Sequence, residues 1–253
     1  MVEALSQALA VPGVPWVFAA AFVAGIVRGF SGFGTAMIFL PVAAQVLPPV
    51  WSVAVLAVMD IIGPLPAIPR ALRDGHPRDL ARLLAGTLVA LPLGLAVLFA
   101  VDPTVFKVAV SVISLGLLVL LVSGLRYHGV LSKWMIYGTG ALSGFLGGAV
   151  AIPGPPVILL YMASPHPARV IRANNMAFLF SYDLLMLAGL ALAGKLSAVP
   201  VALGLMTALP YLAGVSLGGW LFRPGLERVY RWVAYGIIAV SALSGLWSVW
   251  GGA

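Results

Sequence analysis

Residues 24–42 read AGIVRGFSGFGTAMIFLPV, and residues 139–157 read TGALSGFLGGAVAIPGPPV. These two stretches are one motif written twice, each inside a long apolar run. Glycine and proline interrupt a membrane helix only where the freed backbone is buried in protein or lines a cavity. Matched interruptions in two halves of a chain point to the binding site of a transporter. Under a shift of 115 residues the identities are Gly25 with Gly140, Gly29 with Gly144, Phe30 with Phe145, Gly32 with Gly147, Ala36 with Ala151, Pro41 with Pro156 and Val42 with Val157.

The composition around the motif excludes a soluble protein. Of the 253 residues, 62% are hydrophobic and 8% are charged, whereas soluble domains carry roughly 25% charged residues. The whole chain is therefore predicted to lie in a lipid bilayer, with no separate soluble domain. The net charge of +7 comes from basic residues in short links between apolar segments, where they act as topology signals. We expect no nucleic-acid partner. The absence of cysteine excludes disulfides and thiolate metal sites.

The chain divides into two repeats, residues 1–126 and 127–253, which together form a single membrane domain. Besides the motif, Ala90-Leu91-Pro92 recurs as Ala208-Leu209-Pro210. Each repeat has four apolar segments, most of them long enough to cross a hydrocarbon core of about 30 Å. The predicted segments are residues 16–47, 50–68, 81–100, 104–125, 134–162, 173–194, 197–221 and 232–250.

The basic links indicate that the two repeats are inserted upside down relative to each other. The link 69–82 carries four arginines, whereas its counterpart 195–200 carries only Lys195. Basic links stay in the cytoplasm, and inversion requires an odd number of crossings per repeat. The first segment of each repeat can supply this by turning back, because residues 16–30 as a helix reach only about 22 Å. The predicted fold is thus an all-α integral membrane protein with two inverted repeats, the first element of each broken or re-entrant at its Gly/Pro motif.

Arg28 is the most informative charge, because it lies mid-segment directly before the glycines. An arginine there binds an oxyanion with its planar fork, or pairs with an internal carboxylate or reaches the interface. A helix that restarts after the glycines aims free N–H groups at the break, which suits an anion; the same glycines also suit close helix packing. Arg172 is either a site residue or a cytoplasmic anchor. The predicted substrate-binding residues are Arg28, Gly29, Phe30, Ser31, Gly32, Gly34, Pro153, Gly154, Pro155, Pro156, Arg172, Asn174 and Asn175.

Asp60 and Asp183 are the only carboxylates well inside the predicted spans. Each could pair with an arginine or couple transport to protons, so both are candidate coupling residues. The histidines fall in links without ligand spacing, which argues against a metal site. An intramembrane enzyme would need a base beside Ser31 or Ser143, and no histidine lies in a predicted span. We therefore expect no catalytic residues, no cofactor and no metal.

The motif residues, together with PRDLARLLAGTLVALPLG, VDPTVFK and the arginine that follows GPPVILLYM, resemble the TauE/SafE family of sulfite-exporter-like membrane proteins. The resemblance covers nearly the whole chain, and the RGFSGFG and GPP forms look like one subgroup. Residues 149–152 read AVAI where glycines are more usual in the family, which bears on the substrate more than on the fold. The resemblance implies transport of sulfite or an organosulfonate across the bacterial inner membrane.

We therefore expect a multi-pass secondary transporter of small sulfur-containing oxyanions. Access would alternate between the two sides, with the anion held between the two broken elements. Protons are a candidate coupling ion. An anion-selective channel is the alternative, because it would use the same groups, and flux rate separates the two. Monomer and homodimer both remain open.

Overall fold

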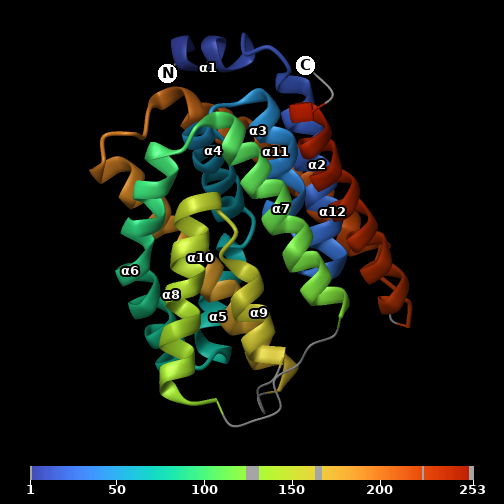
Figure 1. Ribbon diagram of the computed structural model, residues 1–253. Coiled ribbons are helices and arrows are strands. Elements are labelled where there is room, and N and C mark those ends of the chain that lie inside the picture. Colours follow the sequence, from blue (N-terminus) through green and yellow to red (C-terminus); the bar gives the residue numbers. More distant parts are fainter. Residues whose placement is uncertain (1, 124–130, 163–166, 224, 251–253) are drawn as a thin grey trace. The chain divides into compact units, whose positions relative to one another are not determined.

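The computed structural model describes residues 2–123, 131–162, 167–223 and 225–250, and within these ranges every regular element is a helix (Figure 1). This confirms the predicted all-α fold. The elements in chain order are α1 (Val2–Leu9), α2 (Val14–Ser31), α3 (Thr35–Val46), α4 (Pro49–Ile62), the 3-10 helix η1 (Leu65–Ala67), α5 (Ile68–Asp74), α6 (Pro77–Ala100), α7 (Pro103–Val122), α8 (Lys133–Val150), α9 (Gly154–Met162), α10 (Ala168–Leu192), α11 (Ala198–Leu221) and α12 (Glu227–Trp250).

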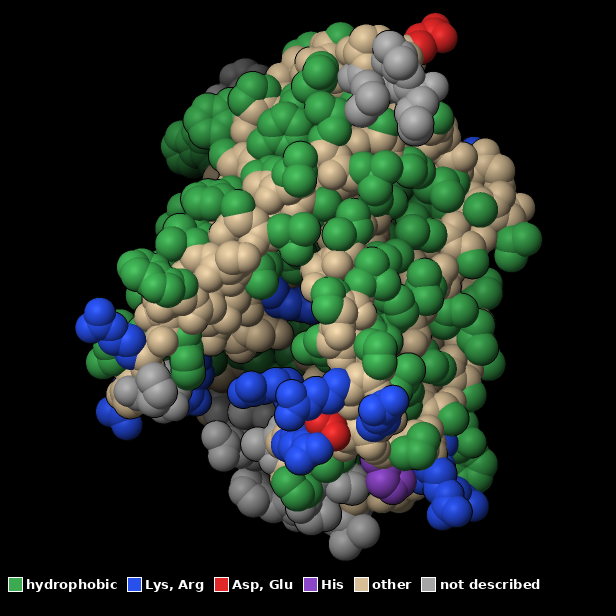
Figure 2. Space-filling view, turned by 180° about the vertical axis from the view of Figure 1, so that it is seen from behind, with side chains coloured by type: hydrophobic (Ala, Val, Ile, Leu, Met, Phe, Trp, Pro, Cys, Tyr) green, Lys and Arg blue, Asp and Glu red, His purple; other side chains and the backbone are tan. Residues whose placement is uncertain are grey.

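Six of the described helices are long and apolar enough to cross a membrane, or seven if α4 and the following η1–α5 segment count as one interrupted span. The six are α2, α6, α7, α10, α11 and α12. Hydrophobic side chains also cover most of the face shown in Figure 2. The chain is therefore a multi-pass membrane protein.

Both segments that contain the motif are interrupted, as predicted. The first stops at Ser31 and restarts at Thr35, and the second stops at Val150 and restarts at Gly154. In each case the two helices on either side of the break pack against each other. Whether they turn back within the membrane, and whether the two repeats are inverted, stays a prediction. The predicted boundary between the repeats, residues 126 and 127, lies outside the described residues.

The second segment, predicted as a single run over residues 50–68, is also interrupted. Here α4 ends at Ile62, and Gly63 and Pro64 precede η1. Proline has no N–H to give to the preceding turn and its ring clashes there. The segment is apolar on both sides of the break, so its hydropathy predicts one uninterrupted span.

The helices form two compact units, and each unit takes elements from both halves of the sequence. Unit 1 contains α1 to α4, α7, α11 and α12. Its most extensive contact joins α2 to α11, and glycines make this contact possible. A Cβ atom at Gly29 would lie 2.3 Å from the carbonyl oxygen of Val215, and one at Gly25 would lie 2.3 Å from that of Tyr211. Packing is therefore an established role of these motif glycines.

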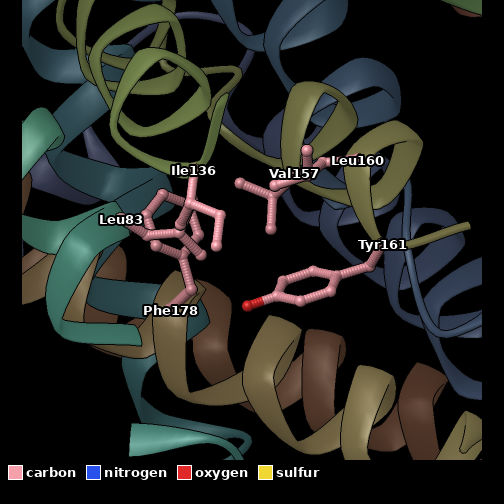
Figure 3. Close-up of a cluster of buried hydrophobic side chains, with 6 residues drawn as sticks. All are labelled: Leu83, Ile136, Val157, Leu160, Tyr161 and Phe178. Carbon is pink, nitrogen blue, oxygen red and sulfur yellow. The ribbon is translucent and has the colours of Figure 1, made fainter. Parts of the chain in front are cut away.

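Unit 2 contains η1, α5, α6, α8, α9 and α10. Here α6 and α8 pack along much of their length, and a Cβ atom at Gly140 would lie 2.1 Å from the carbonyl oxygen of Leu83. A cluster of buried hydrophobic side chains from α6, α8, α9 and α10 fills the interior of this unit (Figure 3). The cluster consists of Leu83, Ile136, Val157, Leu160, Tyr161 and Phe178.

Candidate anion-binding site

The turn between α2 and α3 is built from two glycines in the left-handed backbone region. Gly32 (φ 77°) ends α2 and donates its N–H to the carbonyl oxygen of Arg28 at 2.8 Å, and Gly34 (φ 95°) starts α3. Residues with a Cβ rarely adopt these values. The hydroxyl of Ser31 lies 2.6 Å from the carbonyl oxygen of Val27 and accepts the N–H of Phe33 at 3.3 Å. Ser31 therefore holds the turn together through the main chain.

Arg28 lies in the last turn of α2 and faces Asp60 of α4. Its Nη1 atom is 3.7 Å from Oδ2 of Asp60, and the two side chains are only 15% and 11% exposed. The same nitrogen donates to Oγ1 of Thr35 at 3.3 Å, across the break. A charge-assisted hydrogen bond between an arginine and a carboxylate usually measures about 2.7–2.9 Å. Arg28 and Asp60 thus neutralise each other's charge at a distance longer than such a bond.

A chain of buried hydroxyls continues from Asp60 to the start of α3. The Tyr211 hydroxyl, on α11, donates to Oδ1 of Asp60 at 2.5 Å. It lies 3.5 Å from Oγ1 of Thr35, with either oxygen able to donate. Sequence reasoning missed Thr35 and Tyr211 as site residues. The available signal was a polar residue in an apolar span, directly after Pro210 in the second Ala-Leu-Pro repeat.

The N-terminus of α3 faces the same turn. A helix leaves its first N–H groups without an intrahelical acceptor, and Gly34 provides no side-chain cap for them. Residues 34–37 all carry an N–H. This helix start therefore combines N–H donors with the positive end of a helix dipole, next to the Thr35 hydroxyl to which Arg28 donates.

The start of α9, in the second copy of the motif, differs in its donors. Residues 153–156 read Pro-Gly-Pro-Pro and are all buried, so only Gly154 supplies an N–H there. The prolines remove the donors that would otherwise need a cap. The second break therefore offers an anion far fewer backbone donors than the first.

The remaining predicted residues have separate surroundings. The Phe30 ring packs against the ring of Tyr230, with centroids 5.3 Å apart. Arg172 is exposed near the start of α10. Asn174 is buried and hydrogen-bonded, while Oδ1 of Asn175 is buried without a hydrogen-bond partner among the residues that the structure describes. The structure does not gather these three polar residues of α10 into one cluster.

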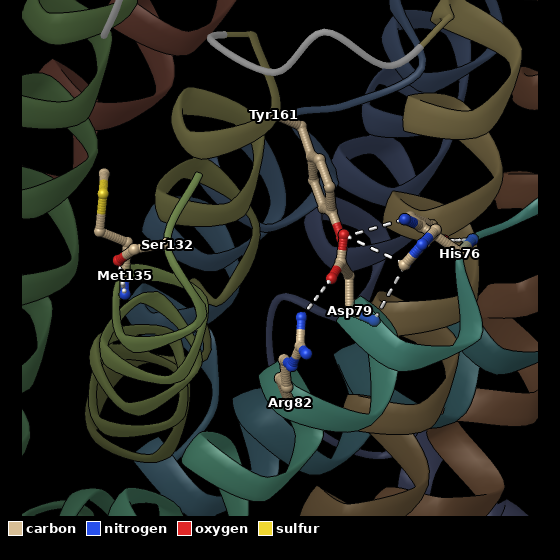
Figure 4. Close-up of polar contacts among 7 residues, drawn as sticks. His76, Asp79, Arg82, Ser132, Met135 and Tyr161 are labelled. Carbon is tan, nitrogen blue, oxygen red and sulfur yellow. Dashed lines mark hydrogen bonds and ion pairs between the residues drawn. The ribbon is translucent and has the colours of Figure 1, made fainter. Parts of the chain in front are cut away.

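Asn174 belongs to a polar cluster of unit 2 that the sequence did not predict. It donates to the Tyr161 hydroxyl at 3.0 Å and accepts the main-chain N–H of His76 at 2.6 Å. Nearby, Asp79 is buried and its carboxylate lies 3.1 Å from Arg82 and 3.3 Å from Nδ1 of His76. In Figure 4 the Tyr161 side chain points toward Asp79. This cluster ties the α5–α6 turn to α9 and α10.

Substituting Asn174 with alanine is expected to lower the free energy of unfolding by about 1–3 kcal/mol, because one buried and one partly buried hydrogen bond lose their partner. The neighbouring Asn175→Ala provides the matched control, since the Oδ1 atom of Asn175 makes no hydrogen bond to any described residue. Thermal unfolding of the purified variants in detergent measures both effects. Equal shifts for the two variants would show that Asn174 holds no special position.

Fold and site together define a multi-pass α-helical membrane protein with a buried ion pair beside an interrupted helix. A family model described as sulfite exporter TauE/SafE matches residues 17–245. The chain belongs to this family, which confirms the resemblance seen in the sequence. The family is described as one of exporters, so the protein is a membrane transport protein. Neither the curated proteins nor the solved structures that were searched gave a match.

Proposed function

We propose that the protein is a secondary transporter of small sulfur-containing oxyanions, of the sulfite and organosulfonate class, in the bacterial inner membrane. The single observation that carries this proposal is the placement of Arg28 beside the uncapped start of α3. Family membership supports the sulfur anion. Transport proceeds by alternating access, driven by an ion gradient or by the gradient of the anion itself.

Within unit 1 the anion contacts the Arg28 guanidinium and the N–H groups of residues 34–37. A guanidinium gives two parallel hydrogen bonds to an oxyanion and stays charged at every physiological pH. The N–H groups add donors that need no second charge. Such a site holds a tetrahedral or pyramidal oxyanion from two directions. Ser31 shapes the turn, and the prolines of residues 153–156 shape the second break.

Arg172 and Asn175 are retained as further candidate contacts in unit 2. Arg172 is exposed, and Oδ1 of Asn175 has no hydrogen-bond partner within the described ranges of the chain. A carbonyl oxygen accepts hydrogen bonds, so Asn175 fits a substrate that carries a donor, such as the ammonium group of an aminosulfonate.

Proteoliposomes test the function directly. Vesicles loaded with unlabelled sulfite should accelerate the uptake of external radiolabelled sulfite, because a carrier that returns loaded turns over faster than one that returns empty. Sulfoacetate and taurine inside the vesicles are expected to exchange as well, whereas acetate should not. Empty liposomes provide the background.

Two results would contradict the proposal. Uptake that does not saturate, carries large currents and shows no acceleration by internal substrate would identify an anion channel. Exchange of acetate as fast as sulfite would show that the site does not select sulfur oxyanions. Either result is readable from the same vesicles.

A further inference from the structure

Asp60 lies in direct electrostatic contact with the arginine proposed to hold the anion. Its Oδ2 atom is 3.7 Å from Nη1 of Arg28, and its Oδ1 atom accepts the Tyr211 hydroxyl at 2.5 Å. Both charged side chains are largely buried. Arg28 and Asp60 therefore contribute one positive and one negative charge, and these balance.

An arriving anion upsets this balance. With Asp60 still ionised, the occupied site would hold two negative charges against one arginine, inside a membrane where uncompensated charge is costly. Protonation of Asp60 restores neutrality. We propose that Asp60 takes up one proton when the anion binds at Arg28, so that each anion is carried together with a proton. This inference rests on the proposed function and names its coupling ion and coupling residue.

The hydrogen-bonded hydroxyls of Tyr211 and Thr35 link the protonation of Asp60 to the anion site. When Asp60 is ionised, the Tyr211 hydroxyl donates to it, and the Thr35 hydroxyl is then able to donate to Tyr211 at 3.5 Å. When Asp60 carries a proton, Asp60 donates to Tyr211 and Tyr211 donates to Thr35. The hydroxyl hydrogen of Thr35, at the start of α3, then no longer takes part in a hydrogen bond to Tyr211. Protonation thereby adds one donor to the anion site at the moment the competing carboxylate loses its charge.

The other charged groups around Asp60 leave this balance unchanged. The helices packed against α4 are α3, α7 and α11. Titratable groups face Asp60 from α11 through Tyr211 and from α2 through Arg28. No residue of α3 is titratable, and the only one in α7 is Lys107, which makes no ion pair among the residues that the structure describes.

The experiment measures proton uptake and anion affinity in parallel on purified full-length protein in detergent. Methanesulfonate is the probe, because it keeps a single charge throughout the accessible pH range. A pH-sensitive dye in weakly buffered solution reports protons taken up per anion bound, and thermal-shift titrations give Kd at each pH. Wild type is expected to take up about one proton per anion, and its Kd should rise by up to about tenfold per pH unit.

Asp60→Asn is the decisive variant, because the amide mimics the protonated acid in size and charge. It should bind methanesulfonate with no proton uptake and with a Kd that does not change with pH. Asp102→Asn is the matched control in the same unit. Asp102 caps the start of α7 through the N–H of Thr104 at 2.7 Å, and asparagine caps a helix equally well. This control should behave as wild type does.

A second variant keeps the proposal falsifiable if Asp60→Asn does not fold. In Tyr211→Phe the ionised carboxylate loses a hydrogen-bond donor, so the pH above which the affinity falls should move upward. An unmoved pH profile would overturn the proposed coupling. Anion binding without proton uptake in wild type would also overturn it. Proton uptake that persists in Asp60→Asn and vanishes in Asp183→Asn would do the same. In all these cases the proposed anion site at Arg28 remains supported. If methanesulfonate, sulfite and sulfoacetate all fail to bind wild type, the anion site itself fails, and the coupling with it.

Discussion

Replacing Arg28 with alanine is expected to weaken methanesulfonate and sulfite binding by about 10- to 150-fold, the equivalent of losing a hydrogen bond to a charged group. The loss should be measured as Kd from thermal-shift titration and as exchange in vesicles. Arg28→Lys keeps the charge without the planar fork and should lie between wild type and alanine. Arg231→Ala, at an exposed position of α12, is the matched control for losing one positive charge.

The alanine variant also leaves Asp60 buried without its counter-charge, which destabilises a protein by about 3–5 kcal/mol. The double variant Arg28→Ala/Asp60→Asn removes both charges and should recover most of that stability. It should still show the loss of affinity of about 10- to 150-fold expected for Arg28→Ala, which separates a binding defect from a folding defect. Normal affinity in this double variant would show that Arg28 serves only the ion pair.

Introducing a side chain at Gly29 is expected to disrupt unit 1. A Cβ atom there would lie 2.3 Å from the carbonyl oxygen of Val215 and 2.8 Å from the main-chain nitrogen of Gly219. Both atoms belong to the backbone of α11, so no rotamer change can relieve the overlap, and α2 must move away. Overpacking typically costs about 1–3 kcal/mol, and a backbone clash falls at the upper end or beyond. Gly29→Ala should therefore lower the yield of monodisperse protein in size-exclusion chromatography and its unfolding temperature.

Gly116→Ala is the control for this substitution, because a Cβ atom at Gly116 in α7 would meet no heavy atom of the described residues within 4 Å. Alanine favours a helix over glycine by about 1 kcal/mol, so this variant should be as stable as wild type or more so. Gly144→Ala extends the comparison to unit 2, where a Cβ would lie 2.7 Å from the carbonyl oxygen of Thr87. If Gly29→Ala and Gly116→Ala unfold at the same temperature, the close contact between α2 and α11 is not required for the fold.

The breaks could be predicted from the sequence because glycine and proline act on the local backbone. The turn at Gly32 and Gly34 needs positive φ values, and Pro153 cannot continue a helix, so both interruptions are encoded where they occur. The break after Ile62 was not predicted even though Gly63 and Pro64 mark it, because hydropathy alone does not distinguish an interrupted apolar run from a single span. Local signals were sufficient in all three places.

The partners of Arg28 could be predicted only in part. Asp60 was foreseen as a carboxylate that could pair with it, because few buried charges were available to choose from. Thr35 and Tyr211 are 176 residues apart in the chain, and their meeting depends on how α11 packs against α2 and α4. No periodicity or spacing in the sequence carries that information. The same holds for Asn174, whose bonds reach back 98 residues to His76.

The α2–α3 turn and the α8–α9 turn differ in backbone flexibility. The first turns on Gly32 and Gly34, residues that interconvert readily among backbone states. The second turns on Ala151 at φ 52°, a strained value for a residue with a side chain, and is followed by three prolines within residues 153–156 whose φ angles are fixed by their rings. The α8–α9 turn is therefore the more rigid of the two. Any backbone rearrangement of these motifs during the transport cycle should therefore be concentrated at the glycine turn, beside Arg28, while the α8–α9 joint keeps its shape.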